Sequence, residues 1–384
     1  MNYTELFERI DSLYSRYVDV WEDVCNIESP TNFKAGVDAV GNYFVDMAKA
    51  RGWRVERFAQ SVSGDIITIT MNPEANDAPI TLSAHIDTVH PLGLFGTPAV
   101  HRDNENIYGP GVTDCKGGAV AAFLAMEALE ECGYKARPIR LVLQSDEEVG
   151  SRLSGRATID YICESSKGSV AFLNLEPHGS NNKVTVARKG ISSLIFKVTG
   201  AAGHSSLCAT QGANAIVEAS HKAIEMDKFK DHKGVTCNVG IITGGTVVNA
   251  IPAYCEFNVN VRYVDEAQLE WIVARAQEIA DKVYVPGCKT ELVHVRGRMP
   301  MLLEERNIEL LNKLNAIYSE CGLPELVPTH SAGGSDAAEV TAAGIPCLDS
   351  LGVVGGYIHS KNEYGVLDSL RTCAFRVGAA VMGL

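Results

Sequence analysis

The sequence has no excess of basic residues, since its 34 lysines and arginines are outnumbered by 47 aspartates and glutamates. The formal net charge of −13 argues against nucleic acid or an anionic membrane as a partner, because both select a basic face. There is also no apolar run of about 18 residues, the length that indicates a membrane span. The opening segment, MNYTELFERIDSLYSRYVDVWEDV, carries acids throughout and no apolar core, so we expect no secretory signal there.

No two cysteines have CxxC spacing, although the chain contains 11 cysteines. An odd number of scattered cysteines in a long chain is typical of reduced, mostly buried thiols, and it predicts a cytoplasmic protein. The nucleotide-binding patterns GxGxxG and GxxxxGKS/T are missing too, so no dinucleotide or P-loop site is predicted. The cysteine pattern also argues against a disulfide scaffold or a zinc finger.

The sequence does contain enough apolar material for a large core, because 46% of its 384 residues are hydrophobic and 21% are charged. This length is about twice that of an ordinary domain, so we expect two domains. In the first half, helical and strand patterns alternate, which predicts an α/β domain whose mostly parallel or mixed sheet is covered by helices. The expected strands are residues 66–71, 80–83, 139–144 and 169–175, and an alanine-rich helix is expected at 118–129.

The pattern changes near Lys189, where strand and helix signals follow the order β-α-β-β-α-β. That order is typical of a small split βαβ (ferredoxin-like) sandwich. The expected strands are residues 191–199, 235–242, 255–264 and 289–295, with helices at 214–226 and 267–282. The simplest division is one α/β domain, residues 1–188 and 298–384, with residues 189–297 inserted into it.

Polar residues that can bind metal follow the predicted strands. In SAHIDTVHP, His85 and Asp87 lie two residues apart, so they share one side of a strand and the acid can fix the imidazole tautomer. The alternative is a hydrogen-bonded edge histidine without a ligand role. In GPGVTDCKGG, glycines flank Asp114 and permit close approach by other groups, although this Asp can also be the N-cap of a helix beginning near Gly117.

Three consecutive acids, Asp146, Glu147 and Glu148, follow an apolar strand in SDEEVGS. A solvated acidic turn is the ordinary explanation of such a run. At the carboxyl edge of an α/β sheet, however, one glutamate can bind a metal while its neighbour acts as a general base. This segment is therefore a second candidate for chemistry.

Two further residues complete the candidate set, because Glu176 ends an apolar strand in LEPHG and His359 follows glycines in GGYIHSKNEY. Together with His85, Asp114 and Glu148, they provide the imidazoles and carboxylates that suit Zn²⁺, Co²⁺ or Mn²⁺. An aspartate shared between two such ions holds them roughly 3.5–4 Å apart, as in two-metal hydrolases.

With these motifs, the sequence resembles the M20 metallopeptidases, and within them the carboxypeptidase G-like (glutamate carboxypeptidase) branch. The matching segments run through nearly the whole chain in the family's order: SAHIDTVHP, GPGVTDCKGG, SDEEVGS, LEPHG, VARKG, GAAGHSS, GANAI, GGTVVNAIPA, VNVRY, GGSDAAE and GYIHSKNEY. The resemblance implies a catalytic di-metal domain, residues 1–188 and 298–384. It also implies an inserted lid domain, residues 189–297, through which two copies form a homodimer.

The resemblance assigns a metal role to five residues. It implies that Asp114 bridges two zinc ions. One site is then completed by His85 and Glu176, and the other by Glu148 and His359. Co²⁺ or Mn²⁺ is expected to substitute for zinc.

The resemblance also implies that Glu147 takes a proton from the bridging water and that Asp87 orients His85. The peptide bond after Asp114 is expected to be cis, which is unusual before a residue other than proline. The residue that follows is Cys115, whose thiol could be taken for a ligand. We expect that it is not one, because the set of histidines and carboxylates is already complete.

In the inserted domain, His204 of GAAGHSS resembles a lid histidine that reaches the partner subunit's site and stabilises the oxyanion of the tetrahedral intermediate there. The residues that resemble holders of the substrate's terminal carboxylate are Asn249, Arg262 and Arg298. Arginine suits this task because its planar fork makes two hydrogen bonds to a carboxylate. Arg296 is an alternative to Arg298 in the segment RGRMPM, and Lys189 is expected to contact the substrate near the hinge.

The remaining polar residues are expected to have structural roles. The histidines that match no metal position, and that we expect to lie at the surface or in the core, are His90, His101, His178, His221, His232, His294 and His330. Asp336 is expected to cap the helix that follows it. Glu363 is a candidate for an acid that supports His359.

These inferences predict a zinc-dependent metallopeptidase of the carboxypeptidase type, which cuts the amide bond before the C-terminal amino acid of a small peptide or N-acyl-amino acid. Alternatives within the same family are an N-acyl-amino-acid deacylase, a dipeptidase, or a deacylase of the acetylornithine or succinyl-diaminopimelate type. A non-catalytic metal-binding protein and a thiol hydrolase are alternatives from other classes.

Overall fold

The computed structural model describes residues 2–231 and 233–384, which divide into two compact units. Unit 1 contains the chain up to Val186 together with Leu303–His330 and Ser335–Leu384. Unit 2 contains Ala187–Leu302 and the short segment Ser331–Gly334. His232, for which a surface or core position is expected, lies outside the described residues.

Unit 1 is built on a six-stranded mixed sheet with the strand order β1-β2-β6-β3-β7-β16. Its strands are β1 (Arg54–Phe58), β2 (Ile66–Met71), β6 (Ile139–Gln144), β3 (Ile80–His85), β7 (Ala171–Asn174) and β16 (Cys347–Leu348). The neighbours β6, β3, β7 and β16 pair in parallel, whereas β1 and β2 are antiparallel additions at one edge. The predicted mixed sheet is thus confirmed.

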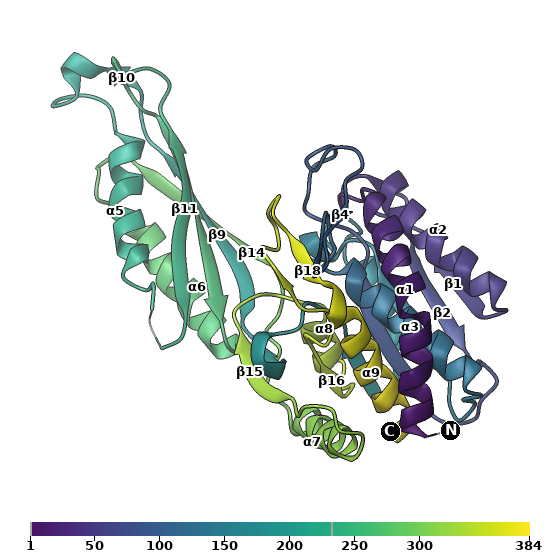
Figure 1. Cartoon of the computed structure of the whole chain (residues 1–384). Coiled ribbons are helices and arrows are strands. Elements are labelled where there is room, and N and C mark those ends of the chain that lie inside the picture. Colours follow the sequence, from purple (N-terminus) through teal and green to yellow (C-terminus); the bar gives the residue numbers. More distant parts are fainter. Residues whose placement is uncertain (1, 232) are drawn as a thin grey trace. The chain divides into compact units, whose positions relative to one another are not determined.

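Every residue of β2 and β3 is buried, because helices cover this sheet. The helices of unit 1 are α1 (Tyr3–Asn26), α2 (Lys34–Ala50), α3 (Lys116–Glu131), α4 (Ala157–Ser165), α7 (Glu305–Glu320), α8 (Ala337–Ala342) and α9 (Leu367–Gly383). Figure 1 shows α1, α3 and α9 side by side, close to both chain ends. None of the described helices is long and apolar enough to cross a membrane.

The first helix illustrates how the sequence specifies these elements. Asn2 caps α1 and forms a capping box with Glu5. Apolar side chains recur every three or four residues from Leu6 to Val24 and are buried, and each contributes roughly 1.5–3 kcal/mol. Trp21, on the same face, donates from Nε1 to the carbonyl of Val112 at 2.9 Å, so α1 also holds the loop that precedes Asp114.

A smaller antiparallel sheet in unit 1 has the order β17-β18-β5-β4. Its strands are β17 (Gly355–Gly356), β18 (Tyr364–Val366), β5 (Asn106–Tyr108) and β4 (His101–Arg102). The loop between β17 and β18 carries His359, so this sheet holds the C-terminal candidate ligand. The chain crosses from unit 1 to unit 2 within two strands, β8 (Lys183–Arg188) and β15 (Val327–Ser331).

Unit 2 has a four-stranded antiparallel sheet of order β11-β13-β9-β14. Its elements are β9 (Gly190–Thr199), α5 (Ala215–Asp227), β11 (Thr236–Gly244), β13 (Tyr254–Tyr263), α6 (Glu266–Asp281) and β14 (Lys289–Arg296). Burial alternates along β9 and β13, and the helices α5 and α6 lie along one face of the sheet (Figure 1). Two short strands, β10 (Gly203–His204) and β12 (Ala250–Ile251), pair separately.

Candidate metal centre

The five candidate ligands meet at one edge of the main sheet. His85 is the last residue of β3, and Glu148 lies in the 3₁₀ turn that follows β6. Glu176 follows β7 by two residues. Since β3, β6 and β7 are parallel neighbours, their carboxyl ends come together there, where α/β sheets place their sites. Asp114 reaches the same place from the turn before α3, and His359 from the β17–β18 loop.

Asp114 lies between the two histidines. Its Oδ1 is 2.9 Å from Nε2 of His85, and its Oδ2 is 3.2 Å from Nε2 of His359. A glutamate accompanies each histidine, because Oε1 of Glu176 lies 3.7 Å from His85 Nε2 and Oε2 of Glu148 lies 3.2 Å from His359 Nε2. The side chains therefore form two donor groups that share Asp114.

The electrostatics of these groups fit divalent cations. Burial raises the pKa of Glu176 well above its ordinary value; the charge of His85 opposes this effect, and the charge of Asp114 adds to it. Hydrogen bonds to Asp114 and Glu148 raise the pKa of His359 to about 10. Three crowded carboxylates and two imidazoles, partly shielded from water, are a donor set suited to divalent cations such as zinc, and donor atoms of His85, Asp114 and Glu148 lie within 4.8 Å of one another.

Asp87 supports this centre through contacts with the ligand His85 and with the turn that carries Glu148. Its Oδ1 lies 3.4 Å from Nδ1 of His85, as expected for an acid that orients a ligand histidine. The same fully buried carboxylate accepts the backbone N–H groups of Glu147 and Glu148, both at 3.2 Å, and the hydroxyl of Thr31 at 2.7 Å. Asp87 thus joins the end of β3 to the turn that carries both glutamates.

Glu147, the predicted base, lies half-buried in this turn beside the ligand Glu148. The charge of its carboxylate is one of the causes that raise the pKa of Glu176, so it acts on the donor group of His85. Its neighbour Asp146 turns away from the centre and binds Thr158 Oγ1 at 2.6 Å and the N–H of Ser154 at 2.9 Å. The three acids are therefore not a uniformly solvated turn.

The loop that carries Asp114 is held by a residue whose contacts differ from those expected. The carboxylate of Glu363 accepts the backbone N–H groups of Thr113 at 2.9 Å and Asp114 at 3.1 Å. It also contacts Nε2 of His90 at 2.7 Å, and both side chains are buried. Glu363 therefore supports Asp114 directly, and His90, expected only to be a surface or core histidine, supports Glu363. The HxDxxH spacing of His85, Asp87 and His90 did not indicate this contact.

The start of α3 approaches the strand end that carries Glu176 because two glycines open the helix. A Cβ on Gly118 would lie only 2.2 Å from the carbonyl oxygen of Leu175. Asp114 does not cap this helix, whose N-cap is Cys115 without a side-chain capping bond, so the alternative explanation of Asp114 is wrong. Asp336 occupies the expected N-cap position of α8, but its side chain makes no capping bond, and the hydroxyl of Ser335 accepts the N–H of Ala337.

Cys115 is the residue beside the centre whose role is least obvious. The Asp114–Cys115 peptide is cis, as the resemblance implied. The Cys115 sulfur lies within ligand range of His85 and Glu176, since donor atoms of the three fall within 4.8 Å of one another. Its thiol, however, donates to the carbonyl of Leu175 at 2.9 Å. The expectation that Cys115 is not a ligand stays a prediction.

The expected oxyanion residue and one carboxylate holder lie together in unit 2. His204 and Asn249 are both exposed, and they adjoin because β10 pairs with β12. The backbone N–H of Ser205 donates to the carbonyl of Asn249 at 3.0 Å. Nδ1 of His204 lies 2.8 Å from the hydroxyl of Ser206. Nε2 is the ring nitrogen that this contact does not use.

Three arginines of unit 2 converge on the segment Ser331–Gly334. Arg262 donates to the carbonyl of Ala332 at 3.1 Å, and Arg188 donates to the carbonyl of Gly333 at 3.1 Å. The side chain of Arg298 packs against Gly334, where a Cβ would come within 2.6 Å of its Cδ. Sequence reasoning missed Arg188, although it stands in the segment VARKG that was singled out for Lys189.

The two remaining substrate candidates are already engaged within unit 2. Arg296 forms an ion pair with Glu266 at 2.8 Å, which favours Arg298 over Arg296 as the carboxylate holder. The ammonium group of Lys189 donates to the carbonyl of Gly234. Neither contact assigns a substrate role, so these roles stay predictions.

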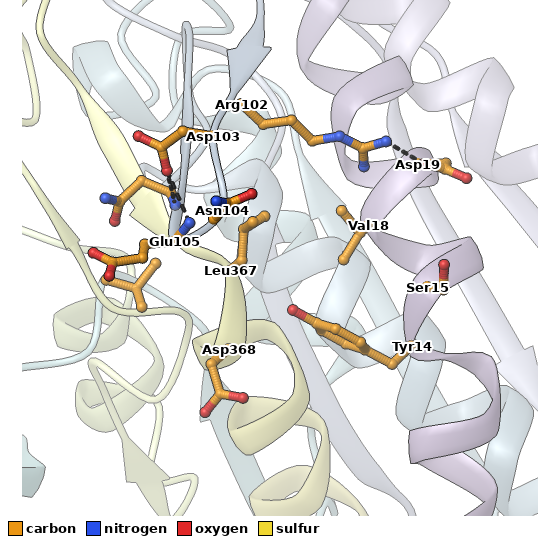
Figure 2. A pocket seen from close by; sticks show the side chains of 12 residues that line it. Tyr14, Ser15, Val18, Asp19, Arg102, Asp103, Asn104, Glu105, Leu367 and Asp368 are labelled. Carbon is orange, nitrogen blue, oxygen red and sulfur yellow. Dashed lines mark hydrogen bonds and ion pairs between the residues drawn. The ribbon is translucent and has the colours of Figure 1, made fainter.

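A separate cavity of about 690 Å³ lies in unit 1 between α1, the β4–β5 hairpin and the start of α9 (Figure 2). Acidic side chains such as Asp103 and Asp368 line it. Its arginine, Arg102, reaches across to Asp19 at 2.8 Å and also pairs with Glu22 at 3.2 Å. None of the candidate metal ligands lines this cavity, so it is separate from the metal centre.

Comparison with known proteins agrees with this geometry. The model of peptidase family M20/M25/M40 matches residues 81–382. Carboxypeptidase G2 of Pseudomonas sp. (strain RS-16) is 29% identical over 385 aligned residues, covering 99% of this chain and 92% of that protein. A succinyl-diaminopimelate desuccinylase of Ruegeria pomeroyi is 27% identical, over 67% of this chain and 69% of that protein.

Solved structures share the fold. Aminopeptidase PepT from Bacillus cereus superposes with a TM-score of 0.81 at 20% identity, covering 96% of this chain and 98% of that chain. An M20 family metallo-carboxypeptidase from Sulfolobus solfataricus superposes with a TM-score of 0.75 at 14% identity, covering 96% and 98%. At these identities the likeness establishes the fold and leaves the substrate open.

Proposed function

The chain belongs to peptidase family M20/M25/M40, a family of metal-dependent peptidases and amidohydrolases, and from this premise we propose that it releases a C-terminal amino acid by hydrolysing the preceding amide bond. The observation that carries the proposal is the position of Asp114, whose two oxygens face His85 and His359. The similarity to carboxypeptidase G2 along nearly the whole chain supports a glutamate carboxypeptidase-like activity.

Two zinc ions would be held by the two donor groups that share Asp114. His85 and Glu176 would serve one ion, and Glu148 and His359 the other. When bound, such ions polarise the scissile carbonyl and lower the pKa of water toward about 7. The pKa of Glu176, raised mainly by burial, supports this assignment, because a bound cation stabilises the carboxylate that burial disfavours.

Glu147 is the general base in this proposal. Its carboxylate accepts a proton from the attacking water as the oxygen bonds to the carbonyl carbon, and it then delivers that proton to the leaving amine nitrogen. The backbone N–H of Glu147 donates to the carboxylate of Asp87, and this hydrogen bond fixes the turn that carries the base. Asp87 thereby orients both the base and the ligand His85.

Unit 2 supplies the substrate contacts in this proposal. Nε2 of His204 donates to the developing oxyanion in the partner subunit's site, across a homodimer formed by the lid. Arg262 and Asn249 hold the terminal carboxylate of the substrate, with Arg298 and Lys189 beside them. Support for Arg262 comes from its surroundings, because its guanidinium is half-buried against the neutral acceptors of Asn260 and Ala332.

The inserted region, predicted as residues 189–297, acts as the lid and dimerisation domain in this proposal, and residues 1–188 and 298–384 act as the catalytic domain. Exposed apolar side chains on the β11–β12 part of unit 2, including Ile241, Val247 and Val248, support a surface that a second copy covers. The eleven free cysteines support the cytoplasmic location expected from the sequence.

A substrate panel tests this proposal. Metal-stripped protein is assayed for amino acid release from N-acyl-glutamates, other N-acyl-amino acids, acetylornithine, succinyl-diaminopimelate and dipeptides, with and without Zn²⁺, Co²⁺ or Mn²⁺. Metal-restored release of glutamate from N-acyl-glutamates supports the carboxypeptidase reaction. Release confined to succinyl-diaminopimelate favours the desuccinylase reaction of the Ruegeria relative instead. No release from any substrate contradicts the proposal.

A further inference from the structure

A second cavity in unit 1, of about 560 Å³, opens beside the ligand Glu148. This volume is in the range of small-molecule sites. Its lining residues come from three segments of the catalytic unit: Pro30, Thr31, Asn32, Thr88, Val89, Pro91, Glu148, Val149, Arg152 and Leu153. The proposed mechanism uses only Glu148 of these residues. Of the candidate ligands, only Glu148 lines this cavity, so it borders the metal centre at that residue.

One wall of the cavity is apolar. Val89 and Pro91 follow the end of β3, Val149 ends the turn that carries Glu148, and Leu153 follows that turn. Val89 has 40% of its surface exposed, although it lies four residues from the buried His85. Such a wall gains free energy by covering the methylene groups of a ligand. These side chains are left partly in water, so a ligand can cover them.

Arg152 gives the cavity its second chemical feature. Among the described residues that line it, Arg152 has the only cationic side chain, and Glu148 has the only anionic one. Within residues 2–231 and 233–384, the guanidinium of Arg152 makes no ion pair and no side-chain hydrogen bond. The other arginine of this segment, Arg156, instead lies 3.5 Å from Asp160. A ligand carboxylate would supply the partner that Arg152 lacks.

We propose that this cavity binds the acyl part of the substrate and selects an acyl group that ends in a carboxylate, such as a succinyl or glutaryl group. The inference rests on the proposed function, since the scissile carbonyl must lie at the Glu148 end. The methylene groups then cover Val89, Val149 and Leu153. The terminal carboxylate pairs with Arg152. A neutral acyl group of the same size also covers the apolar wall, but it cannot form the ion pair with Arg152.

The test separates binding from turnover. The zinc-loaded Glu147→Gln protein is titrated calorimetrically with N-succinyl-glutamate and with its neutral analogue N-succinamoyl-glutamate, in which an amide replaces the terminal carboxylate. We expect about tenfold tighter binding of the succinyl compound, the size of one charge-assisted contact that stays accessible to water. Adding Arg152→Gln should bring the ratio of the two dissociation constants close to one, and Arg152→Lys should restore part of it.

Arg156→Gln is the matched control, because it removes the same charge from the same segment outside the cavity, and it should keep the tenfold ratio. The inference is overturned if the protein that retains Arg152 binds the two compounds equally. It is also overturned if Arg156→Gln loses the preference for the succinyl compound as fully as Arg152→Gln does. Hydrolysis by the protein with Glu147 intact is measured in parallel. A binding preference without any hydrolysis supports the subsite and contradicts the proposed function, so the two failures are distinguishable.

Discussion

Nε2 of His90 and a carboxylate oxygen of Glu363 lie 2.7 Å apart in the interior of unit 1. The same carboxylate accepts the backbone N–H groups of Thr113 and Asp114. The histidine therefore fixes Glu363, and Glu363 fixes the backbone of the aspartate shared by both donor groups. Contacts of this kind hold ligands in the orientation that metal binding requires.

Replacing Glu363 should weaken metal binding without removing a ligand. In Glu363→Gln, an amide group takes the place of one carboxylate oxygen and cannot accept all these N–H bonds. We expect about a 10- to 100-fold loss of zinc affinity, as measured by competition with a chromophoric chelator. His90→Gln, which keeps a donor toward Glu363, is the control and should lose less affinity than His90→Leu. Unchanged affinity in Glu363→Gln would show that this carboxylate does not position Asp114.

Metal binding should release a proton from His359. Hydrogen bonds to Asp114 and Glu148 raise the pKa of this residue to about 10 in the metal-free protein, so its ring is protonated at pH 8. A metal must displace that proton, and zinc affinity should therefore rise with pH until His359 loses its proton near pH 10. Calorimetry in buffers of different ionisation enthalpy counts the released protons. His359→Gln should release about one fewer per two metals, and equal release contradicts the assignment.

Cobalt provides a test of Cys115. Burial raises the pKa of this thiol well above its ordinary value, and the sulfur already donates to Leu175. We therefore expect Co²⁺-loaded protein to lack the intense near-ultraviolet band of thiolate bound to cobalt. Cys115→Ser should have the same spectrum. A band that is present in the original protein and absent in Cys115→Ser would make Cys115 a ligand.

The lid histidine should affect turnover and leave the metals in place. We expect His204→Ala to lower kcat by about 10²- to 10³-fold, the usual effect of losing one donor to an oxyanion. His221→Ala is the control, because His221 also lies in unit 2 but stacks on Tyr284. Metal content is measured in both variants. Normal turnover of His204→Ala with a full metal content rejects its role.

The sequence allowed the mixed sheet and the five candidate ligands to be identified because both depend on local patterns. His85, Glu148 and Glu176 each follow a continuous apolar strand, and Asp114 and His359 stand in glycine-framed loops. Parallel strand ends must meet at one sheet edge, so their proximity follows from the topology. The βαββαβ order in unit 2 could be predicted for the same reason, because buried and more exposed residues alternate along strands β9 and β13.

Contacts between distant segments could not be predicted in this way. His90 and Glu363 are separated by 273 positions, and the segment that singles out Glu363 gives no indication of a contact with His90. Arg188 binds the segment Ser331–Gly334, which is distant in sequence but belongs to the same unit. No hydrophobic periodicity indicates that these two segments lie together. Asp336 occupies the predicted N-cap position of α8, but the hydroxyl of Ser335, one residue earlier, accepts the N–H of Ala337 in place of its side chain.

The central claim is that Glu147 acts as the base beside two bound metals, and one paired measurement tests it most directly. Metal content and amino acid release are determined for the zinc-loaded protein and for Glu147→Gln, with the best substrate of the panel. We predict two metals per chain in both proteins and a fall in turnover of at least about 10²- to 10⁴-fold in the variant. Near-normal turnover of Glu147→Gln with both metals bound would contradict this account of the reaction.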